Sequence, residues 1–133
     1  MLAFVDESKV NKGAFHYYQC LHKLEQHILA NYPDETISLS TAAAVMVMEK
    51  TYCSSFFRRK VGVPFTVWLS LVRLRVAAQK LASCDCRISE VAYAVGFGDI
   101  RTFERNFKRQ TSLTPREYVV RVRSDLVGAP TLT

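Results

Sequence analysis

Two stretches of this chain repeat the same pattern of small and apolar residues. The paired positions, with the earlier stretch first, are Ala43 and Ala92, Met46 and Val95, Val47 and Gly96, Met48 and Phe97, Cys53 and Phe103, and Phe57 and Phe107. Each pattern places a small residue where two helices cross closely, and apolar residues where the second helix is held at a fixed angle. The repeat predicts two helix-turn-helix units, the second with one extra residue in its turn.

The remaining segments also have helical periodicity, and no stretch alternates strongly enough to indicate a strand. The sequence predicts an all-α protein of about seven helices, in which a long central helix joins the two units. That helix, at about residues 65–83, is apolar around most of its girth and should be covered on more than one side. The first helix is expected at about residues 15–31, with an apolar face formed by Tyr17, Leu21, Leu24 and Ile28.

Polar residues mark the start of two predicted helices. Ser38 can cap a helix over the segment LSTAAAVM. At the start of the last helix, Thr114, Pro115 and Glu117 have the spacing of N-cap, N1 and N3 in a capping box. Both signals fix where these helices begin.

The chain has the size and composition of one ordinary domain or two very small ones, with 133 residues of which 49% are hydrophobic. We expect a lead or linker at residues 1–14, a helical domain at residues 15–123 and a flexible tail at residues 124–133. Within the domain, helix-turn-helix units at about residues 38–61 and 88–110 flank the central helix at about residues 65–83.

Positive charge is concentrated after residue 36. Residues 1–36 hold three basic and five acidic side chains, whereas the remainder holds fifteen basic and seven acidic ones. This imbalance favours a polyanionic partner, with nucleic acid ahead of an anionic membrane surface. No stretch has the run of about 20 apolar residues that spans a bilayer, and the first residues do not form an export signal, so we expect a cytoplasmic protein without a membrane partner.

The four cysteines match no disulfide scaffold, which favours reduced thiols. Cys84 and Cys86 have no second Cys or His pair at zinc-finger distance, so no metal site is expected. A thiol enzyme is an alternative, but nothing places a base or an oxyanion donor beside either cysteine. The sequence therefore predicts a protein that is not an enzyme and has no cofactor.

The second helix of each unit presents polar residues where a recognition helix would meet the major groove of double-stranded DNA. Arg can bond guanine in bidentate fashion, and Ser and Thr can contact several base edges. The base-reading candidates are Thr51, Ser54 and Ser55 in the first unit, and Ile100, Arg101, Thr102, Glu104 and Arg105 in the second. The phosphate candidates are Lys50, Arg58, Arg59, Lys60, Arg73, Lys108 and Arg109.

The segment from residue 88 to residue 118 resembles the DNA-binding domain of the AraC/XylS family of bacterial transcription regulators. Its matches to the family signature are Ile88, Val91, Ala92, Gly96, Phe97, Asp99, Phe103, Arg105, Phe107, Lys108, Arg109, Pro115 and Tyr118. The resemblance begins near Ile37 and is weaker in the first unit. It implies a fold of seven helices, regulation of transcription by activation rather than repression, and RNA polymerase as a partner.

Four positions depart from the family pattern, one of them Pro64, which stands where the family favours a Ser or Thr cap. Val47 and Ser112 stand where a turn favours glycine or another small polar residue, and both would be strained at a positive φ. Ser55 stands where the family often has Arg, so base reading is expected to be weaker in the first unit. The sequence leaves open whether the chain is a complete small regulator or part of a larger one with an N-terminal effector or dimerisation domain.

The alternative function is a helical interaction module whose basic surface binds an acidic protein. The central helix favours DNA, because 19 residues at 1.5 Å each span about 28 Å, close to the roughly 34 Å between successive major-groove faces. The sequence therefore predicts that one monomer reads a bipartite, non-palindromic site.

Overall fold

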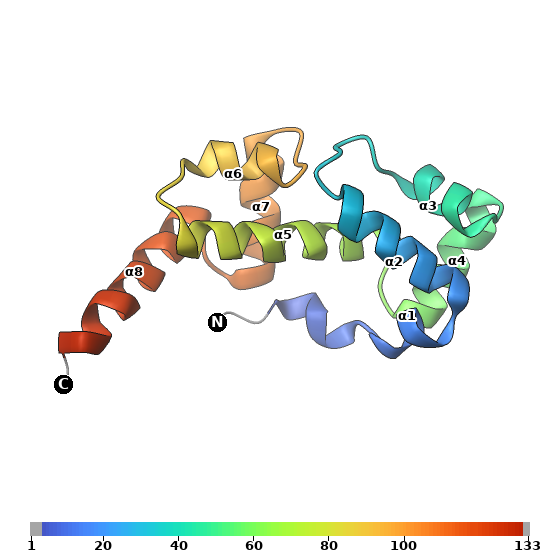
Figure 1. Cartoon of the computed structure of the whole chain (residues 1–133), viewed down its shortest axis with the longest axis horizontal. Coiled ribbons are helices and arrows are strands. Elements are labelled where there is room, and N and C mark those ends of the chain that lie inside the picture. Colours follow the sequence, from blue (N-terminus) through green and yellow to red (C-terminus); the bar gives the residue numbers. More distant parts are fainter. Residues whose placement is uncertain (1–3, 132–133) are drawn as a thin grey trace.

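The computed structural model describes the backbone of residues 4–131 and the side chains of residues 4–124. Over this range the fold contains eight α-helices, one 3-10 helix and no strand, which confirms the predicted all-α class (Figure 1). In chain order the elements are η1 (Val5–Lys9), α1 (Gly13–Tyr17), α2 (Gln19–Asn31), α3 (Leu39–Met46), α4 (Lys50–Val61), α5 (Phe65–Ser83), α6 (Ile88–Ala94), α7 (Ile100–Thr111) and α8 (Pro115–Thr131).

The long helix α5 organises the molecule. It runs through the middle, with α1 to α4 gathered around one end and α6 to α8 around the other (Figure 1). Its first half contributes Phe65, Trp68 and Leu69 to one hydrophobic core, and its second half contributes Leu74 and Leu81 to another. The expectation that this helix is covered on more than one side is confirmed.

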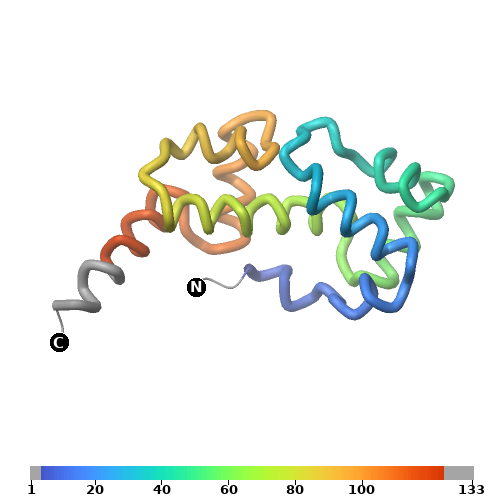
Figure 2. The backbone as a smooth tube through the Cα atoms, viewed as in Figure 1, coloured from blue at the N-terminus to red at the C-terminus, as the bar shows by residue number. Residues whose placement is uncertain are grey.

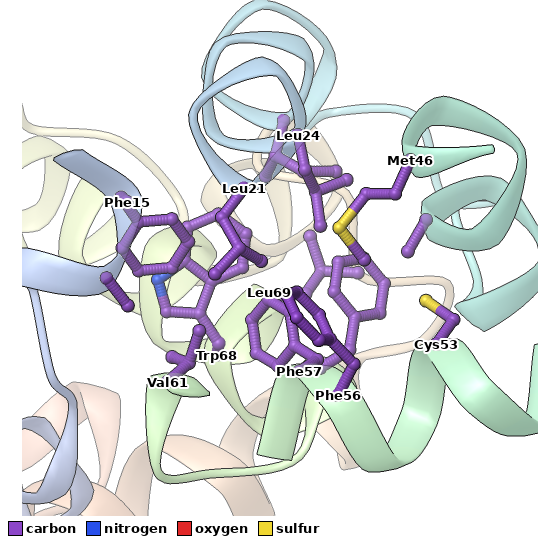
Figure 3. Packing of buried hydrophobic residues seen from close by; sticks show 14 of the residues in the cluster. Phe15, Leu21, Leu24, Met46, Cys53, Phe56, Phe57, Val61, Trp68 and Leu69 are labelled. Carbon is purple, nitrogen blue, oxygen red and sulfur yellow. The ribbon is translucent and has the colours of Figure 1, made fainter. Parts of the chain in front are cut away.

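Aromatic rings fill the core of the first unit, shown in Figure 3. Phe15 stacks on Trp68 with ring centroids 4.8 Å apart, and Phe57 meets Phe15 and Trp68 at 6.1 and 5.7 Å. Phe57 is fully buried and comes from α4, the second helix of the first unit. The core therefore fixes the orientation of α4 against α5 and α1.

The first predicted helix is divided in the structure, which raises the number of α-helices among the described residues from seven to eight. The backbone at Tyr18 is extended, with φ −97° and ψ 118°, and separates α1 from α2. The ring of Tyr18 packs edge-on against Phe56 at 5.6 Å and lies 5.2 Å below the ammonium group of Lys60. As a result Tyr17 is 80% exposed and does not belong to the predicted apolar face.

The helix starts predicted from capping residues are confirmed. The Thr41 hydroxyl accepts a hydrogen bond from the Ser38 backbone N–H at 3.1 Å. At the start of α8, the Glu117 carboxylate accepts from the Thr114 N–H at 2.8 Å, and the Thr114 hydroxyl accepts from the Glu117 N–H at 3.1 Å. Helix α8 continues to Thr131, through most of the predicted tail, and residues 132–133 lie outside the described range.

The N-terminal lead, residues 4–12, packs along both units. Phe4 is buried in the second core, and the Asp6 backbone N–H donates to Gln110 Oε1 at 3.1 Å. Glu7 forms an ion pair with Arg75 on α5. At the other end, the Asn11 N–H donates to the Val61 carbonyl at 2.7 Å. The described part of the predicted linker is thus docked on α7, α5 and the end of α4.

The expectation of four reduced cysteines is wrong for one pair. Cys84 and Cys86 form a disulfide across the α5–α6 connection, while Cys20 and Cys53 are free. The two cysteines are only two residues apart and pair within one loop. A comparison with the cysteine spacing of disulfide scaffolds does not detect such a local bond.

Among the described residues, no single helix is long and apolar enough to cross a membrane. Helices α4 and α5 together have the length and apolar composition of a membrane-spanning segment, but they are bent by 59° at their junction.

Val47 adopts the strained conformation that its sequence position suggested, with φ 54°. Its side chain is 90% exposed, so its removal loses little packing. Val47→Gly is expected to raise the free energy of unfolding by about 1 kcal/mol, because glycine adopts positive φ without a steric penalty. Urea unfolding measures the change. Ala44→Gly, on an exposed helical position of α3, is the matched control and should lower stability by about 1 kcal/mol. Equal effects of the two substitutions would contradict the assignment of strain to Val47.

Candidate nucleic-acid interface

Helices α4 and α7 are built to the same plan. Each has 12 residues and follows an acidic N-cap: Glu49 accepts from the Tyr52 N–H at 2.9 Å, and Asp99 accepts from the Thr102 N–H at 2.7 Å. Each ends at a residue in the left-handed conformation, Gly62 or Ser112. The two acidic caps were not among the predicted functional residues, although an acidic residue just before each helix was a usable signal.

The packed sides of the two helices correspond residue by residue. Cys53, Phe57 and Val61 are buried on α4, and a shift of 50 positions places Phe103, Phe107 and Thr111 at the equivalent buried positions of α7. The opposite faces must then correspond as well. The positions exposed on both helices are Thr51, Ser54, Ser55, Arg58 and Arg59 on α4, and Arg101, Glu104, Arg105, Lys108 and Arg109 on α7. Lys50 and Tyr52 are exposed on α4 as well, whereas their equivalents on α7, Ile100 and Thr102, are half-buried.

The exposed face of α7 carries more positive charge than that of α4. Four of its five side chains are basic, and two of these, Arg101 and Arg105, lie in the first half of the helix. On α4 the equivalent two positions hold Thr51 and Ser55, and Lys50 adds one exposed charge at the helix start. Arg side chains can form bidentate contacts to guanine, and the first half of α7 carries two exposed ones where that of α4 carries none.

Thr102 and Ile100 are less available than the sequence suggested. Thr102 is half-buried, and its hydroxyl donates to Asp99 Oδ2 at 2.9 Å as part of the helix cap. Ile100 is half-buried and lines a groove against α8. The structure therefore does not place these two side chains with Arg101 and Arg105 on the exposed face.

The structure does not place Arg73 on an exposed face with the other phosphate candidates. Arg73 is only 8% exposed, and its guanidinium donates to the carbonyl oxygens of Tyr32 at 2.9 Å and Asp34 at 2.7 Å. Burial lowers the pKa of Arg73, and the nearby carboxylates of Asp34 and Glu35 oppose that change. Helix α5 thus carries a buried cation near its middle.

Lys60 also lies apart from the other phosphate candidates. It is half-buried, with its ammonium group over the Tyr18 ring on the packed side of α4. The structure brings together five of the seven predicted phosphate candidates on exposed faces of the two units: Lys50, Arg58, Arg59, Lys108 and Arg109.

A groove of about 680 Å³ lies beside the first turns of α7. Its lining includes Ile100 and Glu104 from α7, together with Arg87, Arg116 and Arg123. Arg123 is tied to Asp85 at 2.7 Å. Sequence reasoning missed these three Arg residues, because they lie outside the repeated pattern and come together only when α8 packs on α5 and α7. Among the described residues, no group of three or more His, Cys, Asp or Glu could hold a metal ion.

The acidic cap of α7 predicts loss of stability in acid. Hydrogen bonds from the Thr102 backbone and hydroxyl hold the pKa of Asp99 below its ordinary value of 3.8. Because the folded pKa is the lower one, this contribution is present above the unfolded pKa and is lost as pH falls through the folded pKa. Unfolding by urea at pH 5, 4 and 3 should show a steeper loss for the wild type than for Asp99→Asn, which can cap without titrating. Equal slopes would contradict this role.

The comparisons with known proteins agree with the repeated plan of the two units. A family model described as a helix-turn-helix domain matches residues 42–121, which is more than half of the chain. The structure of an AraC-type DNA-binding-domain protein from Chromobacterium violaceum has a TM-score of 0.70 to this chain, with 21% identity, covering 78% of this chain and 92% of that one. The chain belongs to the AraC/XylS family.

Two further proteins are similar to this AraC-type domain, one in sequence and one in fold. The uncharacterised HTH-type transcriptional regulator YijO of Escherichia coli K12 is 30% identical over 107 residues, covering 77% of this chain and 38% of that protein. The DNA-binding domain of AdpA has a TM-score of 0.73 with 24% identity, covering 77% of this chain and 92% of that one. The chain spans 16% to 38% of the length of the first curated relatives that it matches. This family consists of DNA-binding transcription regulators and not of enzymes.

Proposed function

We propose that this domain binds double-stranded DNA in a sequence-specific manner and regulates transcription, with α4 and α7 entering adjacent major grooves. The observation that carries the proposal is the shared register of the two helices, which turns equivalent polar faces outward at the two ends of α5. A basic surface that only bound an acidic protein would not need two copies of the same recognition unit.

The length of α5 supports the use of two grooves by one monomer. Its 19 residues correspond to about 28 Å of helix, close to the roughly 34 Å between successive major-groove faces on one side of B-DNA. A monomer that reads two different boxes needs no palindrome. The AdpA DNA-binding domain, which shares this fold, was crystallised in complex with a target DNA.

Within this proposal, Arg101 and Arg105 read base edges and the five exposed phosphate candidates hold the DNA backbone. The proposal further assigns the regulator an activating role through RNA polymerase and a cytoplasmic location. It keeps open whether the chain is a complete small regulator or part of a larger one with an N-terminal effector or dimerisation domain. These assignments rest on the resemblance to the family.

Selection of bound fragments from a random DNA library tests the proposal. The wild-type domain should enrich a site with two different boxes, and Arg101→Ala should relax selection at one or two base pairs, equivalent to about 1–3 kcal/mol of lost discrimination. Arg121→Ala removes one exposed Arg from α8 instead of α7. It is the charge-matched control and should leave the selected site unchanged.

Two results would contradict the proposal. One is that no defined sequence is enriched at moderate salt, which would favour the alternative function of binding an acidic protein. The other is uniform weakening of all sequences by Arg101→Ala, which would move Arg101 from base reading to the DNA backbone.

A further inference from the structure

The α2–α3 loop, which leads into the first helix-turn-helix unit, touches the second unit directly beside α5. Tyr32, in the loop between α2 and α3, packs against both hydrophobic cores. Gly96, in the turn between α6 and α7, is buried against that loop: a Cβ atom added there would collide with the Tyr32 carbonyl oxygen and lie 2.8 Å from Arg73 Nε. The inter-unit junction is thus formed by Tyr32, Arg73 and Gly96, each from a different segment.

Arg73 holds this junction from the middle of α5. Its Nε and Nη2 groups donate to the carbonyls of Tyr32 and Asp34, so one planar guanidinium fixes two points of the loop. None of the ion pairs between described residues includes Arg73. A buried charge satisfied by two backbone carbonyls is sensitive to the position of both, because a displaced loop leaves a buried donor unpaired.

The junction lies where it can control the rotation of one unit relative to the other. Helix α5 sets the distance between the units, whereas contacts beside α5 limit rotation around its axis. Figure 2 shows the α2–α3 loop and the α6–α7 turn meeting on one side of α5, with the N-terminal lead on the other. Each base pair added between two DNA boxes turns one box by about 34° and moves it by about 3.4 Å. A fixed rotation between the units would therefore select a spacing.

We propose that Arg73 is a positioning residue that fixes the rotation of the two helix-turn-helix units and thereby selects the number of base pairs between the two boxes of a bound site. This inference rests on the proposed two-groove function. It assigns to Arg73 a part in DNA recognition without contact to DNA.

The test measures affinity against spacing with the full chain. The probes are the selected site with one base pair removed, unchanged, and with one or two base pairs added, together with a probe carrying only the box read by α7. The variants are Arg73→Met, which removes the guanidinium, and Arg73→Lys, which keeps the charge but cannot bond both carbonyls in a fork. Lys80→Met, at an exposed position of the same helix, is the control.

The wild type and the control should prefer the native spacing over its neighbours by about tenfold. Arg73→Met should reduce this preference to about threefold or less, and Arg73→Lys should have a preference between those of the wild type and Arg73→Met. All variants should bind the single-box probe within about twofold of one another. This pattern separates positioning from stability, since a loss of folded protein would weaken binding to every probe by the same factor.

An unchanged spacing preference in Arg73→Met would overturn the inference, as would an equal loss on all probes including the single box. If Arg73→Met does not fold, Arg73→Lys is judged by the same two criteria. A wild type without any spacing preference would instead contradict the two-groove function itself, and so the two failures are distinguishable.

Discussion

A fourfold rise in salt concentration should lower the affinity of this domain for its DNA site about 500-fold. Five exposed basic side chains are placed for phosphates: Lys50, Arg58, Arg59, Lys108 and Arg109. Each neutralised phosphate contributes about −0.9 to the slope of log K against log salt, so five give a slope of about −4.5. Fluorescence anisotropy between about 50 and about 200 mM salt measures the slope.

Paired substitutions make the salt prediction specific to the exposed faces. Arg58→Ala combined with Arg59→Ala should bring the slope on the full site to about −2.7. Arg73→Met should have the same slope as the wild type when both are measured on the single-box probe, because Arg73 is buried. A wild-type slope shallower than about −2 would contradict the assignment of these side chains to phosphates.

Replacement of Phe107 by alanine should destabilise the domain by about 3–5 kcal/mol, a large part of the total of about 5–15 kcal/mol that holds a typical domain together. Phe107 is fully buried, with its ring centroid 5.7 Å from that of Phe103 and 5.4 Å from that of Tyr118. It thus links α7 to α8, and the cavity left by its removal is lined by rings that cannot easily collapse.

Urea unfolding followed by circular dichroism measures this loss. Tyr93→Ala is the matched aromatic control, because Tyr93 is 53% exposed on the neighbouring helix α6, and it should cost less than about 1 kcal/mol. Since α5 contributes to both hydrophobic cores, a single unfolding transition is expected for the wild type. A small effect of Phe107→Ala, close to that of Tyr93→Ala, would contradict the position of Phe107 at the centre of the second core.

Local signals in the sequence were sufficient for most of the fold. The bounds of α5 follow from an uninterrupted apolar pattern between Pro64 and the loop at Cys84, and α8 begins where Thr114 and Glu117 form the predicted capping box. The exposed faces of α4 and α7 follow from the internal repeat, because the same spacing of buried residues turns the same positions outward.

Features that depend on distant contacts could not be predicted from such local signals. The break at Tyr18 depends on Phe56 and Lys60, some 40 positions away, and a helical pattern continues through it unchanged. In the sequence, Arg73 has the same appearance as a solvent-exposed cation on a helix. Only the folded loop at Tyr32 and Asp34 shows that its partners are backbone carbonyls.

A monomer that reads two boxes in adjacent major grooves should be sensitive to an insertion between the boxes. Footprinting first locates the boxes on the selected site, and about five base pairs are then inserted between them, which turns one box to the opposite face of the duplex. We expect the affinity to fall at least about tenfold, to that of the single-box probe. An insertion of about ten base pairs returns the box to the same face of the duplex, but affinity should not recover, because α5, about 28 Å long, cannot reach the more distant groove. Unchanged affinity after the five-base-pair insertion would contradict the two-groove account and leave α7 as the only reader.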